Sequence, residues 1–412
     1  MSHSRLLRFA TSALLCAAAL PALASSPAPA NTDCGGLPRL DVKTPPGFCL
    51  AVLGTGFKFP RGVLPLPNGD LIVVDMGGWV AERGTLYLLK RGANGYDKTV
   101  LMKGLDRPNG IAMGPDGMVY VGAVKRIFRF DPAKPAVPVT DVIGGASKVS
   151  ALPGIGRHLL TAMRFDLKGD LYVNVGSGTD HCEGVEGAPV AKPCHEGEGD
   201  EGLGLIRKYE MEWPAGSVKR WEVFARGLRN SMALAVHPAT GELWQGENSR
   251  DAINAAMPAL KNDDDLPHDE LNLVKRGNHY GWPYCYDTNV ASPEYPGTDC
   301  GAYQTPSMLL PGHAAPLGMT FYTGTLFPAL YHNSLIVGFH GYRSHGHRIV
   351  AILPDKAGAP LGKMVDLVSD WNRKGKQGMG APVDIELGQD GNIYLADDRN
   401  GMVLRLQYTA KP

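Results

Sequence analysis

The chain has 412 residues, and its 41 Lys and Arg balance 41 Asp and Glu, so the formal net charge at pH 7 is zero. Without a basic excess the composition argues against a nucleic-acid partner, and without an acidic excess it argues against a disordered chain. The 52 glycines and 32 prolines indicate many turns, which is typical of an all-β fold that can form one domain at this length.

The first 24 residues have the pattern of a secretory signal peptide. A positively charged start is followed by an apolar run from Phe9 to Leu20 and by small residues up to a cleavage position near Ala24. We interpret residues 25–37 as a flexible tether and residues 38–412 as a single domain. No later apolar run is long enough to predict a transmembrane segment. We therefore expect an exported protein, either periplasmic or secreted.

Six cysteines follow the predicted signal peptide. An even count in an oxidising compartment favours disulfides, although six cysteines allow fifteen pairings. No Cys-x-x-Cys occurs, which disfavours a zinc site, and the absence of Cys-x-x-Cys-His excludes a covalently attached c-type haem. Electrons from any redox reaction would therefore leave on a separate acceptor. Spacing along the chain favours three local pairs, namely Cys34 with Cys49, Cys182 with Cys194, and Cys285 with Cys300.

One pattern returns six times along the chain: a short strand, a tight turn that usually contains glycine, and a second apolar strand. Asn-Gly and Asp-Gly turns between such runs are strong hairpin signals. The copies span residues 62–74, 110–121, 162–175, 231–246, 317–339 and 383–396, and a further strand follows most of them.

Six units of a few short strands each predict a six-bladed β-propeller. Residues 181–202 and 250–312 interrupt the regular spacing, and both segments carry cysteine pairs. Because long ordered loops of this kind usually build a binding rim, we expect them to flank the functional face.

In a propeller, the residues just before the first strand of each hairpin converge on the central mouth. Polar groups that gather in such a concave mouth are the default hypothesis for a binding or catalytic site. A structural channel lined by water molecules is the alternative. The convergent positions are Arg61, Asn109, His158, Arg229 with Asn230, His313 and Asp384.

The most specific block of the chain runs from residue 227 to residue 285. It contains Gly-Leu-Arg-Asn at 227–230, Asp-Glu-Leu-Asn at 269–272 and Gly-Trp-Pro-Tyr-Cys at 281–285, and further motifs lie at 157–178 and 313–322. Together these segments, which cover most of the chain after residue 45, resemble the soluble, pyrroloquinoline-quinone-dependent glucose and sorbosone dehydrogenases. That family is six-bladed, in agreement with the count of hairpins.

The resemblance implies that the chain oxidises an aldose or a related small sugar, with pyrroloquinoline quinone as the hydride acceptor. His158 would be the general base for the hydroxyl proton, a role that suits a neutral imidazole near pH 7. Arg229 would contact the quinone oxygen and stabilise the charge that develops there. Asn230 and Asn248 would contact the cofactor. The alternative for His158 is a hydrogen-bonded structural histidine.

The resemblance also implies a calcium ion. In this family calcium is bound largely by backbone carbonyls of the loop after the fourth hairpin, which here places Ser249 and Arg250 as ligands. The ion would act as a Lewis acid on the quinone carbonyl. We interpret the acidic run at 263–265 as a solvated loop rather than a metal cluster.

The chain departs from the family at the groups that bind the three carboxylates of the cofactor, which need cationic partners. Residues 380–383 read Gly-Ala-Pro-Val where relatives place an arginine, and His313 stands where glucose-oxidising relatives use a hydroxyl residue. Arg343, with Arg348 behind it, is our candidate for the missing positive charge, and His340 of the same segment is a further candidate cofactor contact. Arg157 replaces an acid beside the base, which leaves the preferred sugar open.

Two rival functions share the predicted shape. Calcium-dependent lactonases and esterases with six blades need carboxylates and asparagines clustered as metal ligands on the axis. This chain also has Arg61 and Arg229 there, whose positive charges would oppose a bound metal ion. A non-catalytic propeller that binds a glycan or a protein would need neither a cofactor slot nor His158.

Overall fold

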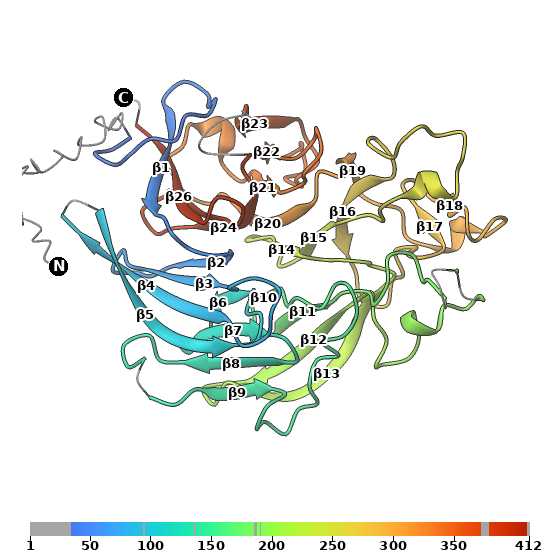
Figure 1. Cartoon of the computed structure of the whole chain (residues 1–412), viewed down its shortest axis with the longest axis horizontal. Helices are drawn as coiled ribbons and strands as arrows, with labels where there is room; N and C mark the ends of the chain where they lie inside the picture. The colour runs from blue at the N-terminus through green and yellow to red at the C-terminus, as the bar shows by residue number, and fades with distance from the viewer. Residues whose placement is uncertain are drawn as a thin grey trace, which may run out of the picture.

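The computed structural model describes residues 34–93, 95–135, 137–184, 188–189, 191–371 and 379–409. It is an all-β structure in which six four-stranded sheets are arranged around a centre (Figure 1). The predicted signal peptide and residues 25–33 of the predicted tether lie outside the described residues. Within the described part of the chain, no helix has both the length and the apolar character needed to cross a membrane.

Each sheet is one blade, built from strands that follow one another outward from the centre. Blades one and two are β2 Pro60–Pro65, β3 Leu71–Asp75, β4 Gly84–Gly92 and β5 Gly95–Leu105, and then β6 Ile111–Met113, β7 Val119–Ala123, β8 Arg126–Phe130 and β9 Thr140–Ile143. Blades three and four are β10 Met163–Phe165, β11 Leu171–Val175, β12 Leu205–Glu212 and β13 Ser217–Arg226, and then β14 Ala233–Val236, β15 Leu243–Glu247, β16 His268–Val274 and β19 Met308–Gly312. Blades five and six are β20 Pro316–Phe321, β21 Leu335–Phe339, β22 Arg348–Ile352 and β23 Met364–Val368, and then β24 Pro382–Leu387, β25 Ile393–Asp397, β26 Met402–Tyr408 and β1 Phe48–Gly54.

All six predicted hairpins are present, and each joins the first two strands of one blade. In five of them a glycine in the turn has a positive φ, for example +85° at Gly69 and +75° at Gly117. In the fifth hairpin Asn333 takes the left-handed conformation instead, with φ of 60°. These turns need residues that tolerate positive φ, such as Gly and Asn, and the turns could therefore be predicted from the sequence.

The second strand of every blade is buried along its whole length, from β3 to β25. Such a strand has neighbours on both faces, because it packs between the adjacent blades. Two of the outermost strands are different: β5 and β13 are largely exposed or half-buried. The core of the protein therefore lies between blades, around their second strands.

The ring is closed by the N-terminal strand. Strand β1 pairs antiparallel with β26, with Phe48 opposite Tyr408, and so completes the sixth blade with residues from the opposite end of the described chain. A disulfide joins Cys34 to Cys49 at the start of β1. Both cysteines are buried. Pairing of the two ends of the fold in one sheet leaves no blade at an open edge of the ring.

A narrow channel follows the axis and is lined by residues of the innermost strands of all six blades, or beside them. Inside it, the guanidinium of Arg164 lies 3.5 Å from Asp384 and 2.5 Å from Glu386. Asp384 also accepts the backbone N–H of Val63 at 3.0 Å, which links the first and sixth blades. Asp384 therefore contributes to the channel wall, below the mouth.

The first interruption, 181–202, lies within the loop between β11 and β12, whereas the second differs from its predicted extent. Residues 250–312 include β16 and β19, which are the third and fourth strands of blade four, so the true additions are the segments 248–267 and 275–307. The second addition carries a small hairpin of β17 Cys285–Tyr286 and β18 Val290–Ala291. Short 3₁₀ turns complete the loops, namely η2 His195–Gly197, η3 Ile253–Ala255, η4 Cys300–Ala302 and η5 Ala329–Tyr331.

The predicted pairing of the cysteines is confirmed. Cys182 is bonded to Cys194, and Cys285 is bonded to Cys300. These two disulfides lie in one buried cluster with the aromatic rings of Tyr284 and Tyr295, so the two rim additions are packed against each other.

The channel ion pairs generate a stability prediction. Burial raises the pKa of Glu386 to about 8 and also raises the pKa of Asp384, while Arg164 opposes both shifts. Arg164→Met should therefore cost about 2–3 kcal/mol at neutral pH, less than for a fully buried pair because these side chains are 14–19% exposed. A carboxyl whose pKa is raised in the folded state lowers the free energy of unfolding as pH rises, because it must ionise while buried. The loss of stability caused by Arg164→Met should therefore be larger at pH 8 than at pH 5.

Urea unfolding at the two pH values measures this effect. Arg220→Met, at an arginine of an outer strand whose side chain is 78% exposed, serves as the control and should leave stability unchanged. An equal loss at both pH values would contradict the role assigned to the two acids.

Candidate active site

Two sets of loops meet on one face of the ring: those that lead into the first strands and those that leave the second strands. In three blades an acid at the end of the second strand fixes one loop to the other through backbone N–H groups. Asp75 accepts the N–H groups of Lys58 and Phe59 at 2.8 Å, Glu247 accepts that of Asn230 at 2.9 Å, and Asp397 accepts that of Ala381 at 3.2 Å. The mouth is therefore built from paired loops.

The predicted base His158 is oriented by Ser177, which follows strand β11. The Nδ1 atom of His158 lies 2.8 Å from the hydroxyl oxygen of Ser177 and 3.2 Å from its backbone carbonyl. The Ser177 hydroxyl donates its own proton to the carbonyl of Thr179 at 2.6 Å. The hydroxyl must then accept from His158, so Nδ1 carries the imidazole proton and Nε2 presents a lone pair.

The surroundings of His158 keep it neutral. Burial lowers its pKa well below 6.5, the charge of Arg229 lowers it further, and Asp180 opposes these effects only in part. A neutral imidazole with a free Nε2 lone pair is the form that can accept a proton at pH 7.

Arg229 and His158 lie in the same site. The N–H of Ser177 donates to the carbonyl of Arg229 at 2.8 Å, so one residue bonds to both. The guanidinium of Arg229 is buried and donates to the carbonyl of Asp180 at 3.0 Å, to its carboxylate, and to the carbonyl of Asn248 at 2.8 Å. These bonds immobilise its positive charge beside the base.

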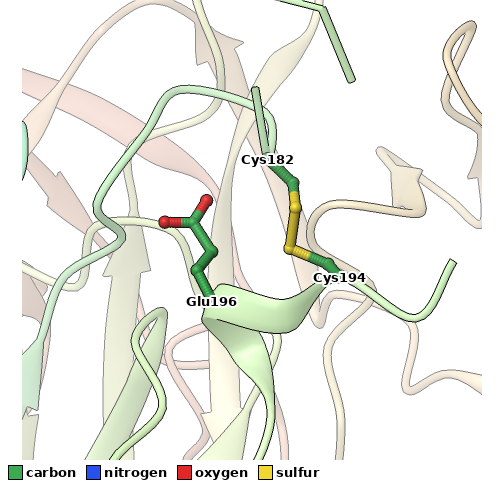
Figure 2. A group of neighbouring side chains, drawn as sticks. All are labelled: Cys182, Cys194 and Glu196. Atoms are coloured by element: carbon green, nitrogen blue, oxygen red, sulfur yellow. A yellow bond between two sulfur atoms is a disulfide. The ribbon is translucent and has the colours of Figure 1, made fainter. Parts of the chain in front are cut away.

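The rim segment that contains Glu196 supports the loop that carries Ser177. Glu196 lies near the disulfide of Cys182 and Cys194 (Figure 2). Its carboxylate accepts the N–H groups of Gly178 at 2.9 Å and Thr179 at 3.1 Å, directly after Ser177. Because the two sulfur atoms are bonded to each other, they offer no thiolate for a metal. The group therefore serves to position the loop of Ser177.

Asp180, His181 and Glu183 form a second group with metal-ligand atoms within 4.8 Å of one another. Arginines already pair with its acids: Arg229 contacts Asp180, and Arg157 lies 3.5 Å from Glu183. The positive charges disfavour a cation there.

The predicted cofactor-binding amides lie beside Arg229. The side chain of Asn248 donates to the carbonyls of Asn230 at 3.1 Å and Pro316 at 3.0 Å. The Oδ1 atom of Asn230 is buried and has no hydrogen-bond partner among the described residues. An unpaired buried oxygen of this kind can accept a hydrogen bond from a ligand.

The loop that carries the predicted calcium ligands rests on buried acids. Asp269 accepts the N–H of Ser249 at 2.9 Å, and no described residue donates a hydrogen bond to the carbonyl oxygens of Ser249 or Arg250. Burial raises the pKa of Glu247 and of Asp269 to about 7, and raises that of Glu270 well above its usual range. Free carbonyls above buried carboxyls suit a hard divalent cation.

The predicted cationic anchors are present at the mouth, and each has an acidic neighbour. Arg343 forms a two-point ion pair with Asp263, at 2.6 and 3.0 Å, and His313 lies 3.7 Å from the same carboxylate. Asp263 is buried, so the interpretation of residues 263–265 as a solvated loop is wrong for this residue. A buried carboxylate is stable here because Arg343 pairs with it.

His340 lies on another side of the mouth. Its Nε2 atom is 3.0 Å from Asp398, and Asp398 also pairs with Arg61 at 2.7 Å. Arg61 in turn donates to Asn109 at 2.9 Å. Arg61, with Asn109 bonded to it, is thus joined to His340 through an acid that the sequence did not single out.

Ser177, Asp180, Asp251 and Asp398 were missed as site residues. All four follow a second strand, whereas the position-based prediction covered the residues before first strands; residues after second strands, such as Asn248 and His340, were predicted only from the family resemblance. The signal was available, since in a propeller the second strands run back toward the same face, and a polar residue just after each one marks the mouth.

These residues fit an anionic cofactor with calcium. The mouth offers immobilised guanidinium groups from Arg61, Arg229 and Arg343, an unpaired amide oxygen at Asn230 and two free carbonyls. Beside them lies a small open pocket lined by Arg229, Glu247, Ser249, Arg250 and Trp282, among others.

Comparison with known proteins gives matches along most of the chain. The family model described as glucose/sorbosone dehydrogenase matches residues 214–405, and the model described as TrAA12-like matches residues 42–299, more than half of the chain. An uncharacterized protein of Borreliella burgdorferi is 29% identical over 89% of this chain and 91% of its own length. A pyrroloquinoline quinone-dependent sugar dehydrogenase of Hypocrea jecorina is 22% identical over 88% and 89%.

Among solved structures, the iodide structure of a Trichoderma reesei enzyme of Carbohydrate-Active Enzymes family AA12 has a TM-score of 0.69 at 20% identity. The similarity covers 90% of this chain and 98% of that one, and it supports the six-bladed fold. The sequence matches and the fold together show that the chain belongs to the family of soluble pyrroloquinoline-quinone-dependent glucose and sorbosone dehydrogenases.

Proposed function

We propose that this chain is an exported quinoprotein that oxidises an aldose or related sugar, with His158 as the general base. The observation that carries the proposal is the position of Ser177, which bonds to both His158 and the backbone of Arg229. This arrangement places a proton acceptor next to a fixed positive charge. The three disulfides support export, because disulfides persist in oxidising compartments.

His158 would accept the proton of the sugar hydroxyl at Nε2. Its Nδ1–H remains bonded to Ser177, so the ring keeps its orientation as it becomes positively charged. The carboxylate of Asp180 would partly offset that new charge. Pyrroloquinoline quinone, when bound, would supply the acceptor for the hydride that leaves the same carbon.

Arg229 would stabilise negative charge that develops on the acceptor. Its guanidinium is already fixed by Asp180 and Asn248, so little reorganisation is needed during the reaction. Asn230 would contact the cofactor edge through its unpaired Oδ1.

Calcium would be bound by the backbone carbonyls of Ser249 and Arg250, and it would act as a Lewis acid. Burial raises the pKa values of Glu247, Asp269 and Glu270, and these carboxyls would ionise as calcium binds and then offset the charge of the ion. Asp269 would also fix the loop through the N–H of Ser249.

The hydrolase alternative is less well supported by the axial residues. A lactonase-like metal cage needs free carboxylates on the axis, whereas Asp384 and Glu386 pair with Arg164 and Asp398 pairs with Arg61. A purely binding propeller would not need an imidazole held in one tautomer beside a buried arginine.

Reconstitution is the direct test of the proposal. The purified protein, stripped with EDTA, should reduce an artificial dye with aldoses only after both pyrroloquinoline quinone and calcium are added, and magnesium should replace calcium poorly. Dye reduction without the quinone would contradict the assigned chemistry. Full activity in EDTA would contradict the calcium assignment alone.

His158→Gln should reduce kcat by at least about 100-fold, because general-base catalysis contributes about that much or more. Binding of the quinone, followed by fluorescence, should change little, since base and cofactor anchors are separate groups. His332→Ala is the control: this histidine bonds to Phe327 in the loop between β20 and β21 and should keep full activity. Equal activity of His158→Gln and the wild type would exclude His158 as the base.

The pH profile of kcat/KM tests the electrostatics of the base. Activity needs neutral His158 and is lost as pH falls through its pKa, which lies below 6.5. The acid limb should therefore fall below pH 6.5. Arg157→Gln removes a positive charge that lowers this pKa, so it should move the limb to higher pH. A limb above pH 6.5 in the wild type, or a shift to lower pH in the variant, would contradict the assignment.

A further inference from the structure

One carboxylate at the mouth has three positively charged or protonatable neighbours from different parts of the chain. Asp251 lies 3.5 Å from Arg229, 3.6 Å from Nδ1 of His313 and 3.9 Å from Arg343. We call these three neighbours the anion pocket. The side chain of Asp251 is nevertheless 60% exposed, so it occupies the solvent side of this pocket.

The arginines of the anion pocket do not need Asp251 for charge balance. Arg229 already pairs with Asp180, and Arg343 already pairs with Asp263 at 2.6 Å. Both of those carboxylates are buried. Two arginines thus have four carboxylates within 4.0 Å, namely Asp180, Asp251, Asp263 and Asp264, and a further anion would meet excess negative charge while Asp251 remains in place.

The backbone of Asp251 is fixed, but its side chain is free to turn outward. Its N–H donates to Asp180 at 3.2 Å, and the N–H of the next residue, Ala252, donates to Asp263 at 2.7 Å. Ala252 has a left-handed backbone conformation, with φ of 51°. Rotation of the Asp251 side chain into solvent would break only its three long contacts, and exposed contacts of this kind contribute little stability.

We propose that Asp251 is an internal substitute for a ligand carboxylate: it occupies the anion pocket and is displaced when a carboxylated ligand binds. The inference rests on the proposed function, in which the ligand is the quinone with its carboxylates. A sugar acid would present the same chemical group. In either case Asp251 weakens binding, because the ligand must compete with it for Arg229, His313 and Arg343.

The test compares Asp251→Asn with Asp264→Asn. Asp264 is the matched control, since it belongs to the same added segment, is 52% exposed and lies 3.7 Å from Arg343. Affinity for pyrroloquinoline quinone is measured by fluorescence titration of the cofactor-free protein in calcium, and affinity for D-glucuronate by thermal shift. Asp251→Asn should bind one of these probes about three- to tenfold more tightly than the wild type, and the gain should shrink at high salt. Asp264→Asn should bind as the wild type does.

The two probes distinguish a carboxylate of the cofactor from a carboxylate of the substrate. Tighter binding of the quinone assigns the pocket to the cofactor, and tighter binding of glucuronate alone assigns it to the substrate. Equal or weaker binding of both probes by Asp251→Asn, or an equal gain in Asp264→Asn, would overturn the proposal. If no variant binds the quinone, the proposed function fails, while the glucuronate measurement still decides the role of Asp251.

Discussion

The structure depends on closure of the ring by strand β1. Every second strand is buried on both faces, so each blade needs a neighbour on either side. The sixth blade has its full set of strands only because β1 pairs with β26. If this pairing opened, buried surfaces of blades one and six would be exposed together, and the loops that meet at the mouth would lose their common frame. The site is therefore a product of the closed ring.

Within that frame, a short segment after β11 determines the chemistry. Ser177 fixes the tautomer of His158 and bonds to the backbone of Arg229, and Asp180 pairs with the guanidinium of Arg229. The disulfide of Cys182 and Cys194 and the hydrogen bond from Gly178 to Glu196 stabilise this segment. In the proposed mechanism, residues that do not contact the substrate thus orient the proton acceptor His158 and the positive charge of Arg229.

The hairpins, the blade count and the cysteine pairing could be predicted because each depends on local signals. Turn residues with positive φ and cysteines close in sequence are readable without knowledge of tertiary contacts. Asp263 could not be read in this way: its burial depends on Arg343, which is eighty residues away. Strands β16 and β19 were not predicted within 250–312, because the disulfide-bonded addition separates them in the sequence. The mouth was predicted in part, since residues after the second strands were expected there only where the family resemblance implied them, as for Asn248 and Arg343.

The central claim is that His158 and Arg229 face one flat ligand together. A crystal structure of the protein soaked with pyrroloquinoline quinone and calcium tests it most directly. The account predicts cofactor density at the mouth, within hydrogen-bond distance of Arg229, with His158 Nε2 directed at the space above the quinone ring. Density for the cofactor away from these two residues, or an Nε2 atom turned away from it, would contradict the account.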